Sequence, residues 1–263
     1  MTDHDLSNLV FPAVVAHRGA SSTRPENTLS SFEEAIRLGA QIVEFDVRLT
    51  RDGVPVVMHD PAVDRTTDGT GFVHELTAAE IARLHVDGQA RVGGEMRVPT
   101  LDAVLEVLSG RAGAAIEIKN IPGEPAFDPA RERIVEAVHA GLGRVGFEGP
   151  VLVISFNPAS IAASKASAPG VPTGFLTTDL VDPREALAFA VAQGHDMVLP
   201  GTRASIPAGA TFVEEVHAAG VRAGTWTVDD PETVGMLFDR GFDAVASNDP
   251  AMALGVLTER ARS

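Results

Sequence analysis

The amino-acid sequence predicts a closed (β/α)8 barrel of the TIM type, an α/β fold, on three observations. Apolar runs of four to seven residues alternate along the chain with segments of helical period. Glycine or proline often marks the junction between a run and a helical segment. The length of 263 residues is one that such a barrel commonly reaches as a single domain.

A doubly wound open sheet is the competing fold, because it also joins parallel strands through helices. That fold places a glycine-rich phosphate turn after its first strand. Here the first apolar run is followed by Arg18-Gly19-Ala20, which offers one glycine only. The closed barrel is therefore the favoured prediction.

The order of the elements follows from the same alternation. The candidate strands are Ala13–His17, Ile42–Leu49, Val54–Met58, Ala114–Lys119, Val151–Ser155, Thr173–Leu176, Met197–Leu199, Arg222–Thr227 and Ala244–Ala246. The candidate helices are Thr28–Leu38, Leu101–Leu108, Ala130–Ala140, Pro158–Ala166, Arg184–Gln193, Thr211–Ala219, Glu232–Arg240 and Ala251–Glu259. In the first of these helices one face carries Leu29, Phe32 and Ile36, and Gly39 is placed to end it.

The stretch from about residue 61 to residue 99 is too long for a simple link between a strand and a helix. It carries a helix signal of its own, ELTAAEIARL. We expect it to form a small insertion over the carboxyl ends of the strands. No linker or low-complexity tract interrupts the sequence, so residues 1–263 are expected to form a single barrel domain.

The composition excludes several classes of function. Lysine and arginine minus aspartate and glutamate is 21 − 36 = −15, which disfavours binding to nucleic acid or to an anionic membrane surface. The sequence has no apolar run of about 18 residues, so we expect no membrane span. Its first residues lack a basic stretch followed by an apolar one, so we expect no secretory signal. A cytoplasmic location is therefore expected. The absence of cysteine leaves oxygen and imidazole as the ligands for any metal.

Two acidic side chains in QIVEFDVRLT are predicted to point into the barrel. The alternation places Val43, Phe45 and Val47 on the face toward the helices, and Glu44 and Asp46 on the inward face. Adjacent buried carboxylates repel each other unless a cation or a proton neutralises them. A hard divalent metal ion would do so.

The same pattern recurs in AAIEIKN, where Glu117 and Lys119 share the inward face of a second strand. Three carboxylates with water suit Mg²⁺ or Ca²⁺, and the lack of sulfur or clustered imidazole argues against zinc. The alternative for each strand is a structural salt bridge between its acid and a basic side chain.

Two histidines end apolar runs in the same way: His17 before Arg18-Gly19, and His59 before Asp60-Pro61. In barrel enzymes the chemistry lies at the carboxyl ends of the strands, so both are candidate catalysts. The single tryptophan, Trp226, is equally compatible with a core role and a substrate contact, whereas core packing is expected for Phe156. The remaining histidines are interpreted as structural or solvated: His4, His74, His85, His139, His195 and His217.

Taken together, these residues resemble the glycerophosphodiester phosphodiesterase family. The resemblance runs in family order over most of the chain. It rests on His17-Arg18-Gly19, Pro25-Glu26-Asn27-Thr28, Glu44-x-Asp46-Val47, Asp52-Gly53, His59-Asp60, Arg65-Thr66-Thr67, Glu117-Ile118-Lys119, Ser155-Phe156 and Trp226-Thr227-Val228. The resemblance implies a TIM barrel with a small insertion, and metal-dependent hydrolysis of a glycerophosphodiester to glycerol 3-phosphate and an alcohol.

The resemblance also implies roles for the site residues. Glu44, Asp46 and Glu117 would be the ligands of one divalent cation, Mg²⁺ or Ca²⁺, and His17 and His59 the acid and the base. Arg18 and Lys119 would bind the phosphate, and Trp226 would contact the substrate. The Pro-Glu-Asn-Thr segment would start the next helix, with Asn27 or Thr28 as its cap.

The sequence departs from the family in one late loop. The family pattern Thr-Asp-x-Pro stands here as Ser247-Asn248-Asp249-Pro250. Because no proposed catalytic group lies there, we expect the change to affect only substrate shape or barrel closure.

Two rival functions are possible on the same barrel. One is phospholipase D-type cleavage of a lysophospholipid or sphingolipid on the same barrel, which would need an apolar entrance. The insertion shows few large apolar residues beyond one helix face, which favours a soluble glycerophosphodiester as substrate. The other rival is a binding or scaffold barrel that has lost its chemistry, and its expected sign, a missing histidine or carboxylate, is absent from the motifs above.

Overall fold

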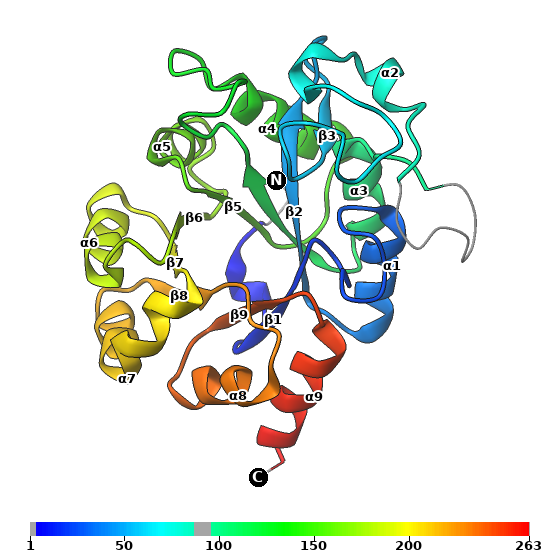
Figure 1. Cartoon of the computed structure of the whole chain (residues 1–263). Helices are drawn as coiled ribbons and strands as arrows, with labels where there is room; N and C mark the ends of the chain where they lie inside the picture. Colours follow the sequence, from blue (N-terminus) through cyan, green and yellow to red (C-terminus); the bar gives the residue numbers. More distant parts are fainter. Residues whose placement is uncertain (1–3, 87–95, 263) are drawn as a thin grey trace.

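A computed structural model of the chain describes residues 4–86 and 96–262. In this part of the chain eight parallel strands form one sheet that closes on itself through the pairing of the first strand with the second. Figure 1 shows the helices arranged as a ring around these strands. The predicted barrel is confirmed. The parallel strands are β1 (Ala13–His17), β2 (Ile42–Leu49), β4 (Gly113–Ile118), β5 (Val151–Ser155), β6 (Thr173–Thr177), β7 (Met197–Pro200), β8 (Arg222–Thr225) and β9 (Ala244–Ser247).

The helices follow the strands as the sequence predicts, with boundaries that capping residues set. Thr28 caps α1 by accepting a hydrogen bond from the backbone N–H of Ser31, and Gly39, at φ 94°, ends that helix. The helices of the ring are α1 (Leu29–Leu38), α3 (Leu101–Leu108), α4 (Arg133–Val145), α5 (Pro158–Ser167), α6 (Pro183–Gln193), α7 (Thr202–Ala218), α8 (Pro231–Asp239) and α9 (Pro250–Arg260).

The predicted helix Ala130–Ala140 is α4 (Arg133–Val145), and two other predicted elements differ more from the structure. Helix α7 begins at Thr202, nine residues before the predicted start at Thr211, and it is interrupted at Gly209, whose φ of 72° is non-helical. The candidate strand Val54–Met58 is β3 (Pro55–Val57), which pairs antiparallel with β2 and is therefore not one of the barrel strands. A short apolar run shows that a strand exists but not its direction.

Apolar side chains fill the interior of the barrel and the space between its strands and the helices. One cluster, with Val15, Ile42 and Leu152, lies inside the barrel, and larger clusters lie between the strands and the helices. The part of the insertion that is described, residues 61–86 and 96–99, carries η2 (Val73–Glu75) and the short helix α2 (Ala78–Ile81), beside β3 in Figure 1. This segment packs with β3 and the residue after it in a separate apolar cluster, formed by Val56, Met58, Val63, Val73, Ile81, Val86 and Val98.

At the amino end of the barrel the chain begins with η1 (Leu6–Asn8). The backbone N–H of Val151, where β5 starts, donates to the carbonyl of His4, and Leu6 joins the interior cluster. The opposite, carboxyl end is thus the open one. Among the described residues no helix is long and apolar enough to cross a membrane.

Candidate active site

Three carboxylates meet at the carboxyl ends of the neighbouring strands β2 and β4. Asp46 lies opposite Glu117 in the register of these strands, and Glu44 precedes it on the same face. All three side chains are buried, and one ligand atom from each lies within 4.8 Å of the others. The structure thus brings together the acids that the alternation of the sequence places on the inward face.

The charges of these carboxylates strongly perturb one another. Burial, with the charge of Asp46 added, raises the pKa of Glu44 to about 8. Burial likewise raises the pKa of Glu117 to about 7, against the opposing charge of Lys119. Burial acts on Asp46 too, but Lys119 and Arg18 outweigh it and hold the pKa of Asp46 below its usual range. The nearby cations thus favour the ionised form of Asp46, whereas burial favours the protonated forms of Glu44 and Glu117.

The basic side chains beside the cluster balance only part of the negative charge that the three carboxylates would carry if all were ionised. Lys119 Nζ lies 3.0 Å from Asp46 Oδ1 and 2.5 Å from Glu117 Oε1, and Arg18 Nε lies 3.4 Å from Asp46 Oδ2. Glu44 Oε1 is buried and makes no hydrogen bond within the described chain. An all-oxygen donor set with an unused buried oxygen fits a hard cation such as Mg²⁺ or Ca²⁺.

A tight turn after β1 places His17 and Arg18 beside this cluster. Arg18 and Gly19 both have positive φ, 56° and 81°, and the backbone N–H of Arg18 donates to Glu44 Oε2 at 2.8 Å. A Cβ at Gly19 would lie 2.7 Å from the carbonyl carbon of Ser31, so only glycine permits this approach to α1. The turn leaves His17 Nε2 3.9 Å from Glu44 Oε2.

His59 reaches the same site by a route that the sequence did not indicate. It follows the antiparallel strand β3, so the expectation that it ends a barrel strand is wrong. The hairpin returns the chain to the mouth, where the N–H of Met58 donates to the carbonyl of Asp46 and Arg48 donates to the carbonyl of His59. His59 Nδ1 lies 2.6 Å from Asp60 Oδ1.

A chain of ion pairs connects the two histidine loops. Arg65, from the insertion, contacts Asp60 through its Nε at 2.5 Å and Glu26 through both terminal nitrogens at 3.0 and 2.7 Å. Glu26 in turn accepts from Arg18 Nη1 at 3.0 Å. Arg65 therefore connects the loop of His59 to the loop after β1. This contact gives a structural role to the motif residues Glu26 and Arg65, to which the sequence assigned none.

Asn27 positions a metal-ligand candidate instead of capping a helix. Thr28 is the cap of α1. Asn27, in the left-handed region at φ 56°, donates from Nδ2 to Asp46 Oδ2 at 2.7 Å and accepts from the backbone N–H of Asp46 at 3.3 Å. Its side chain fixes the orientation of the Asp46 carboxylate from the side opposite Lys119 Nζ, which contacts the other oxygen.

The late loop that departs from the family pattern touches a catalytic candidate directly. Asn248 Oδ1 lies 2.8 Å from His17 Nδ1. The expectation that this loop affects only substrate shape or barrel closure is therefore wrong. The two residues are 231 positions apart, so no local signal in the sequence could have joined them.

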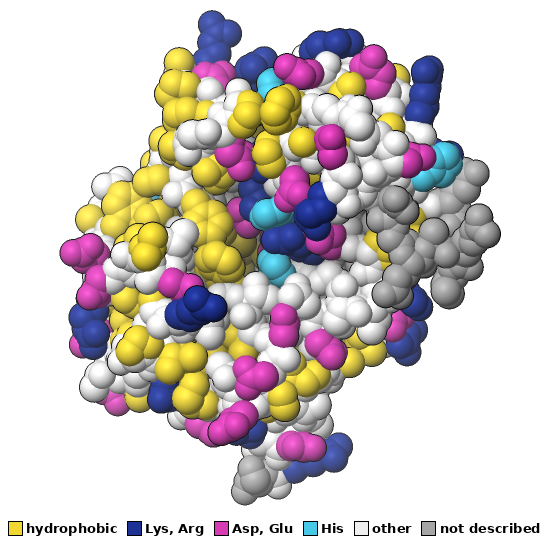
Figure 2. Space-filling view, viewed as in Figure 1, with side chains coloured by type: hydrophobic (Ala, Val, Ile, Leu, Met, Phe, Trp, Pro, Cys, Tyr) yellow, Lys and Arg dark blue, Asp and Glu magenta, His cyan; other side chains and the backbone are white. Residues whose placement is uncertain are grey.

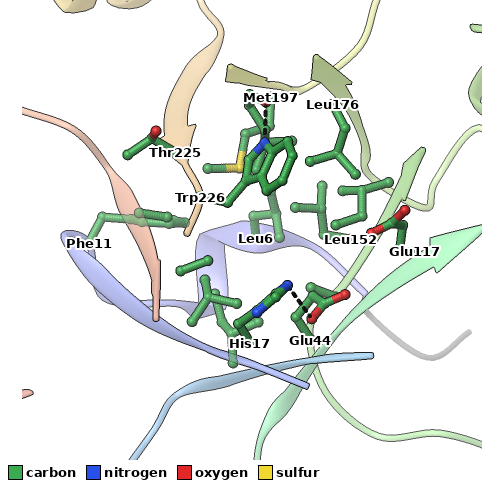
Figure 3. Close-up of a pocket in the computed structure, with 17 residues that line it drawn as sticks. Leu6, Phe11, His17, Glu44, Glu117, Leu152, Leu176, Met197, Thr225 and Trp226 are labelled. Carbon is green, nitrogen blue, oxygen red and sulfur yellow. Dashed lines mark hydrogen bonds and ion pairs between the residues drawn. The ribbon is translucent and has the colours of Figure 1, made fainter. Parts of the chain in front are cut away.

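Trp226 stands across an apolar cavity from the histidine. Its indole N–H donates to the carbonyl of Leu199 at 3.0 Å, and its ring meets Phe156 edge-on with centroids 5.2 Å apart. Figure 3 shows the cavity between Trp226 on one side and His17, Glu44 and Glu117 on the other. Phe156 is only partly buried, and Lys119 Nζ lies 5.9 Å from its ring centroid.

In the space-filling view of Figure 2, histidine, basic and acidic side chains gather at the centre of the carboxyl face, with an apolar surface along one side. The remaining histidines make their contacts elsewhere. Their contacts include Gly149 for His4, Phe72 for His74, Asp68 for His85, Ser164 for His139, Thr173 for His195 and Asp243 for His217.

The sequence matches one protein family over most of its length. The model of the glycerophosphoryl diester phosphodiesterase family matches residues 17–252, which include every site residue described above. The chain belongs to this family. Its members are enzymes, and this chain is a phosphodiesterase by that membership.

Individual relatives within the family agree with this assignment. A glycerophosphodiester phosphodiesterase of Caldanaerobacter subterraneus is 35% identical over 252 residues, 93% of this chain and 97% of the relative. An Oleispira antarctica phosphodiesterase, solved in complex with the product sn-glycerol-3-phosphate, superposes with a TM-score of 0.81 at 27% identity, covering 94% and 97% of the two chains. A glycerophosphodiester phosphodiesterase of Agrobacterium tumefaciens gives 0.76 at 27% identity, covering 92% and 99%.

Proposed function

We propose that this enzyme hydrolyses glycerophosphodiesters to glycerol 3-phosphate and an alcohol, using one divalent cation and two histidines. The observation that carries the proposal is the convergence of His17 and His59 on the cluster of Glu44, Asp46 and Glu117 at one end of the barrel. The Oleispira relative, which holds sn-glycerol-3-phosphate as its product, supports the choice of substrate.

Glu44, Asp46 and Glu117 would hold the cation, which when bound neutralises charge on the phosphoryl oxygens. The need for a cation follows from the balance of charges in the site. Arg18 and Lys119 are too few to balance three ionised carboxylates, so without a metal burial favours the protonated forms of Glu44 and Glu117. A divalent ion makes the site positive. Arg18 and Lys119 then complete the binding of the phosphate.

The two histidines would divide the proton transfers. Burial lowers the pKa of both imidazoles, and the charges of Arg18 at His17 and of Lys119 at His59 lower it further. His59 keeps a carboxylate, Asp60, on its Nδ1, and this stabilises the imidazolium that a general acid needs. His17 would take the proton from the attacking hydroxyl, and His59 would give one to the departing alkoxide.

One assay with a panel of glycerophosphodiesters tests the proposal. Glycerol 3-phosphate should form, chelation should abolish its formation, and Mg²⁺ or Ca²⁺ should restore it. Full activity after exhaustive chelation would contradict the role of the cation.

Location in the cytoplasm and the single-domain organisation stay predictions.

The histidine roles can be separated with a substrate that releases p-nitrophenol. A good leaving group needs little protonation, so His59→Ala should recover much of its lost rate on that substrate, whereas His17→Ala should not. Equal relative defects on both substrates would contradict the division of roles.

The apolar cavity favours a second candidate, phospholipase D-type cleavage of a lysophospholipid or sphingolipid. Leu152, Leu176, Met197 and Leu199 line it together with Glu44 and Glu117, and these four apolar side chains would accept an apolar group rather than a hydrated one. Turnover of glycerophosphocholine measured beside that of lysophosphatidylcholine decides between the two. Higher kcat/KM on the lysolipid would favour the second.

A further inference from the structure

Asn248, in the loop between β9 and α9, bonds to the edge of His17 that faces away from the carboxylates. Its Oδ1 lies 2.8 Å from His17 Nδ1 and 3.0 Å from Ser21 Oγ. The other ring nitrogen, Nε2, is the one 3.9 Å from Glu44 Oε2. The imidazole is thus held from behind by an amide while its free edge faces the site.

Asp229 fixes which end of the Asn248 amide meets the histidine. One Asp229 oxygen accepts from Asn248 Nδ2 at 2.6 Å, and the other accepts from the backbone N–H of Asn248 at 2.8 Å and from Ser247 Oγ at 3.0 Å. A carboxylate only accepts hydrogen bonds. The amide nitrogen of Asn248 must therefore point to Asp229, and its oxygen must point to His17.

The oxygen of an amide is also only an acceptor, so His17 Nδ1 must carry a proton to bond with it. In the neutral ring the lone pair then lies on Nε2, toward the cavity and the carboxylates. We infer that Asn248, oriented by Asp229, is a positioning residue that holds His17 in the Nδ1–H form with Nε2 ready to accept a proton. This inference rests on the proposed function in taking His17 as the base.

The amide differs from a carboxylate in one respect that matters here. Both accept a hydrogen bond from Nδ1, but the amide adds no negative charge to a site that already holds Glu44, Asp46 and Glu117. Asn248 therefore fixes the ring without adding to the repulsion of a phosphodiester. That is a physical reason for an asparagine at this place of the chain.

The test compares two substitutions at one position. Asn248→Leu removes the acceptor with little change in size, and Asn248→Asp keeps it. Nitrogen-15 spectra of histidine-labelled protein, with the His17 signals assigned by their loss in His17→Gln, report which ring nitrogen bears the proton. Steady-state kinetics on glycerophosphocholine report kcat and KM. Asn8→Leu makes the same chemical change at an exposed residue of η1, at the amino end of the barrel, and serves as the control.

The wild type should show a protonated Nδ1, and Asn248→Leu should shift the proton toward Nε2 and lower kcat by about 10²-fold, with KM changed less than about twofold. Asn248→Asp should keep the Nδ1–H form but give a kcat between those of the leucine variant and the wild type, because its carboxylate loses the bond to Asp229 and adds negative charge. Asn8→Leu should alter neither the ring form nor kcat. Should Asn248→Leu not fold, Asp229→Asn serves instead, because it frees the amide to turn over.

The inference is overturned if the wild-type ring carries its proton on Nε2, or if Asn248→Leu leaves both the proton and kcat in place. The spectra need no substrate. A wild type with the expected ring form, a proton shift in the leucine variant and no turnover of any glycerophosphodiester would refute the proposed function while supporting the positioning of the ring.

Discussion

The charge of Glu44 opposes folding when no cation is bound, and Glu44→Gln should reveal this. The folded chain holds the pKa of this carboxyl at about 8, against a usual 4.5, so at about pH 7 it keeps a proton that the unfolded chain releases. Keeping that proton over about 2.5 pH units, at about 1.4 kcal/mol per unit, disfavours folding by at most about 3 kcal/mol. This loss of stability begins as the pH rises above the pKa of Glu44 in the unfolded chain, and it is complete above the pKa of Glu44 in the folded chain.

Glutamine cannot ionise, and its oxygen still accepts the 2.8 Å hydrogen bond from the backbone N–H of Arg18. With a chelator present, the variant should therefore melt above the wild type, by at most about 6 to 12 °C for a domain of this size. With Mg²⁺ or Ca²⁺ at about 100 times its Kd, the wild type should gain about 3 kcal/mol, whereas the variant should gain little. With the cation bound, the melting temperature of the wild type should therefore approach or exceed that of Glu44→Gln.

Thermal and urea unfolding of both proteins, each with EDTA and with the cation, measure this. Glu106→Gln is the matched control, because Glu106 is exposed on α3. A Glu44→Gln protein that is less stable than the wild type in EDTA would refute the reasoning, since the charge would then be a structural partner of Arg18.

Three further predictions concern the same site. At about pH 6 cation binding should release protons from Glu44 and Glu117, whose pKa values are about 8 and about 7, and at about pH 9 it should release none. Calorimetry in buffers of different ionisation enthalpy measures the protons released. Binding heats that do not depend on the buffer at about pH 6 would contradict the prediction. Arg65→Lys should lower kcat by about tenfold to 10²-fold with little change in KM, since an ammonium cannot bridge Asp60 and Glu26 as the guanidinium does; unchanged kinetics would remove Arg65 from the support of the site. Arg18→Lys should lower kcat/KM by about 10²-fold, and near-normal turnover would show that Arg18 does not bind the phosphate.

The sequence predicts those features of the site that depend on local pattern. Alternation along one strand places Glu44 and Asp46 on the inner face, and the neighbouring strand places Glu117 beside them, so the cluster follows once the barrel is assumed. Long-range partners are different. Asn248 and His17 meet only because β9 pairs with β1 in the barrel.

The misread elements have local physical causes. The run Val54–Met58 has the composition of a barrel strand, but the Asp52-Gly53 turn before it, with Gly53 at φ 78°, reverses the chain into an antiparallel hairpin. Asp60 resembles an ordinary turn residue before proline, and only the folded hairpin shows that its carboxylate meets His59.

The separate apolar cluster beneath the insertion has a consequence for how the enzyme loses activity. The loop of His59 follows β3, where Val56 and Met58 pack in that small cluster while Val57 packs in the core of the barrel. Small clusters open at lower free energy than the main core of a protein. Heat inactivation can thus precede global melting, with the barrel and its carboxylates intact, and substitutions in the insertion can tune the working temperature of the enzyme without altering the stability of its scaffold.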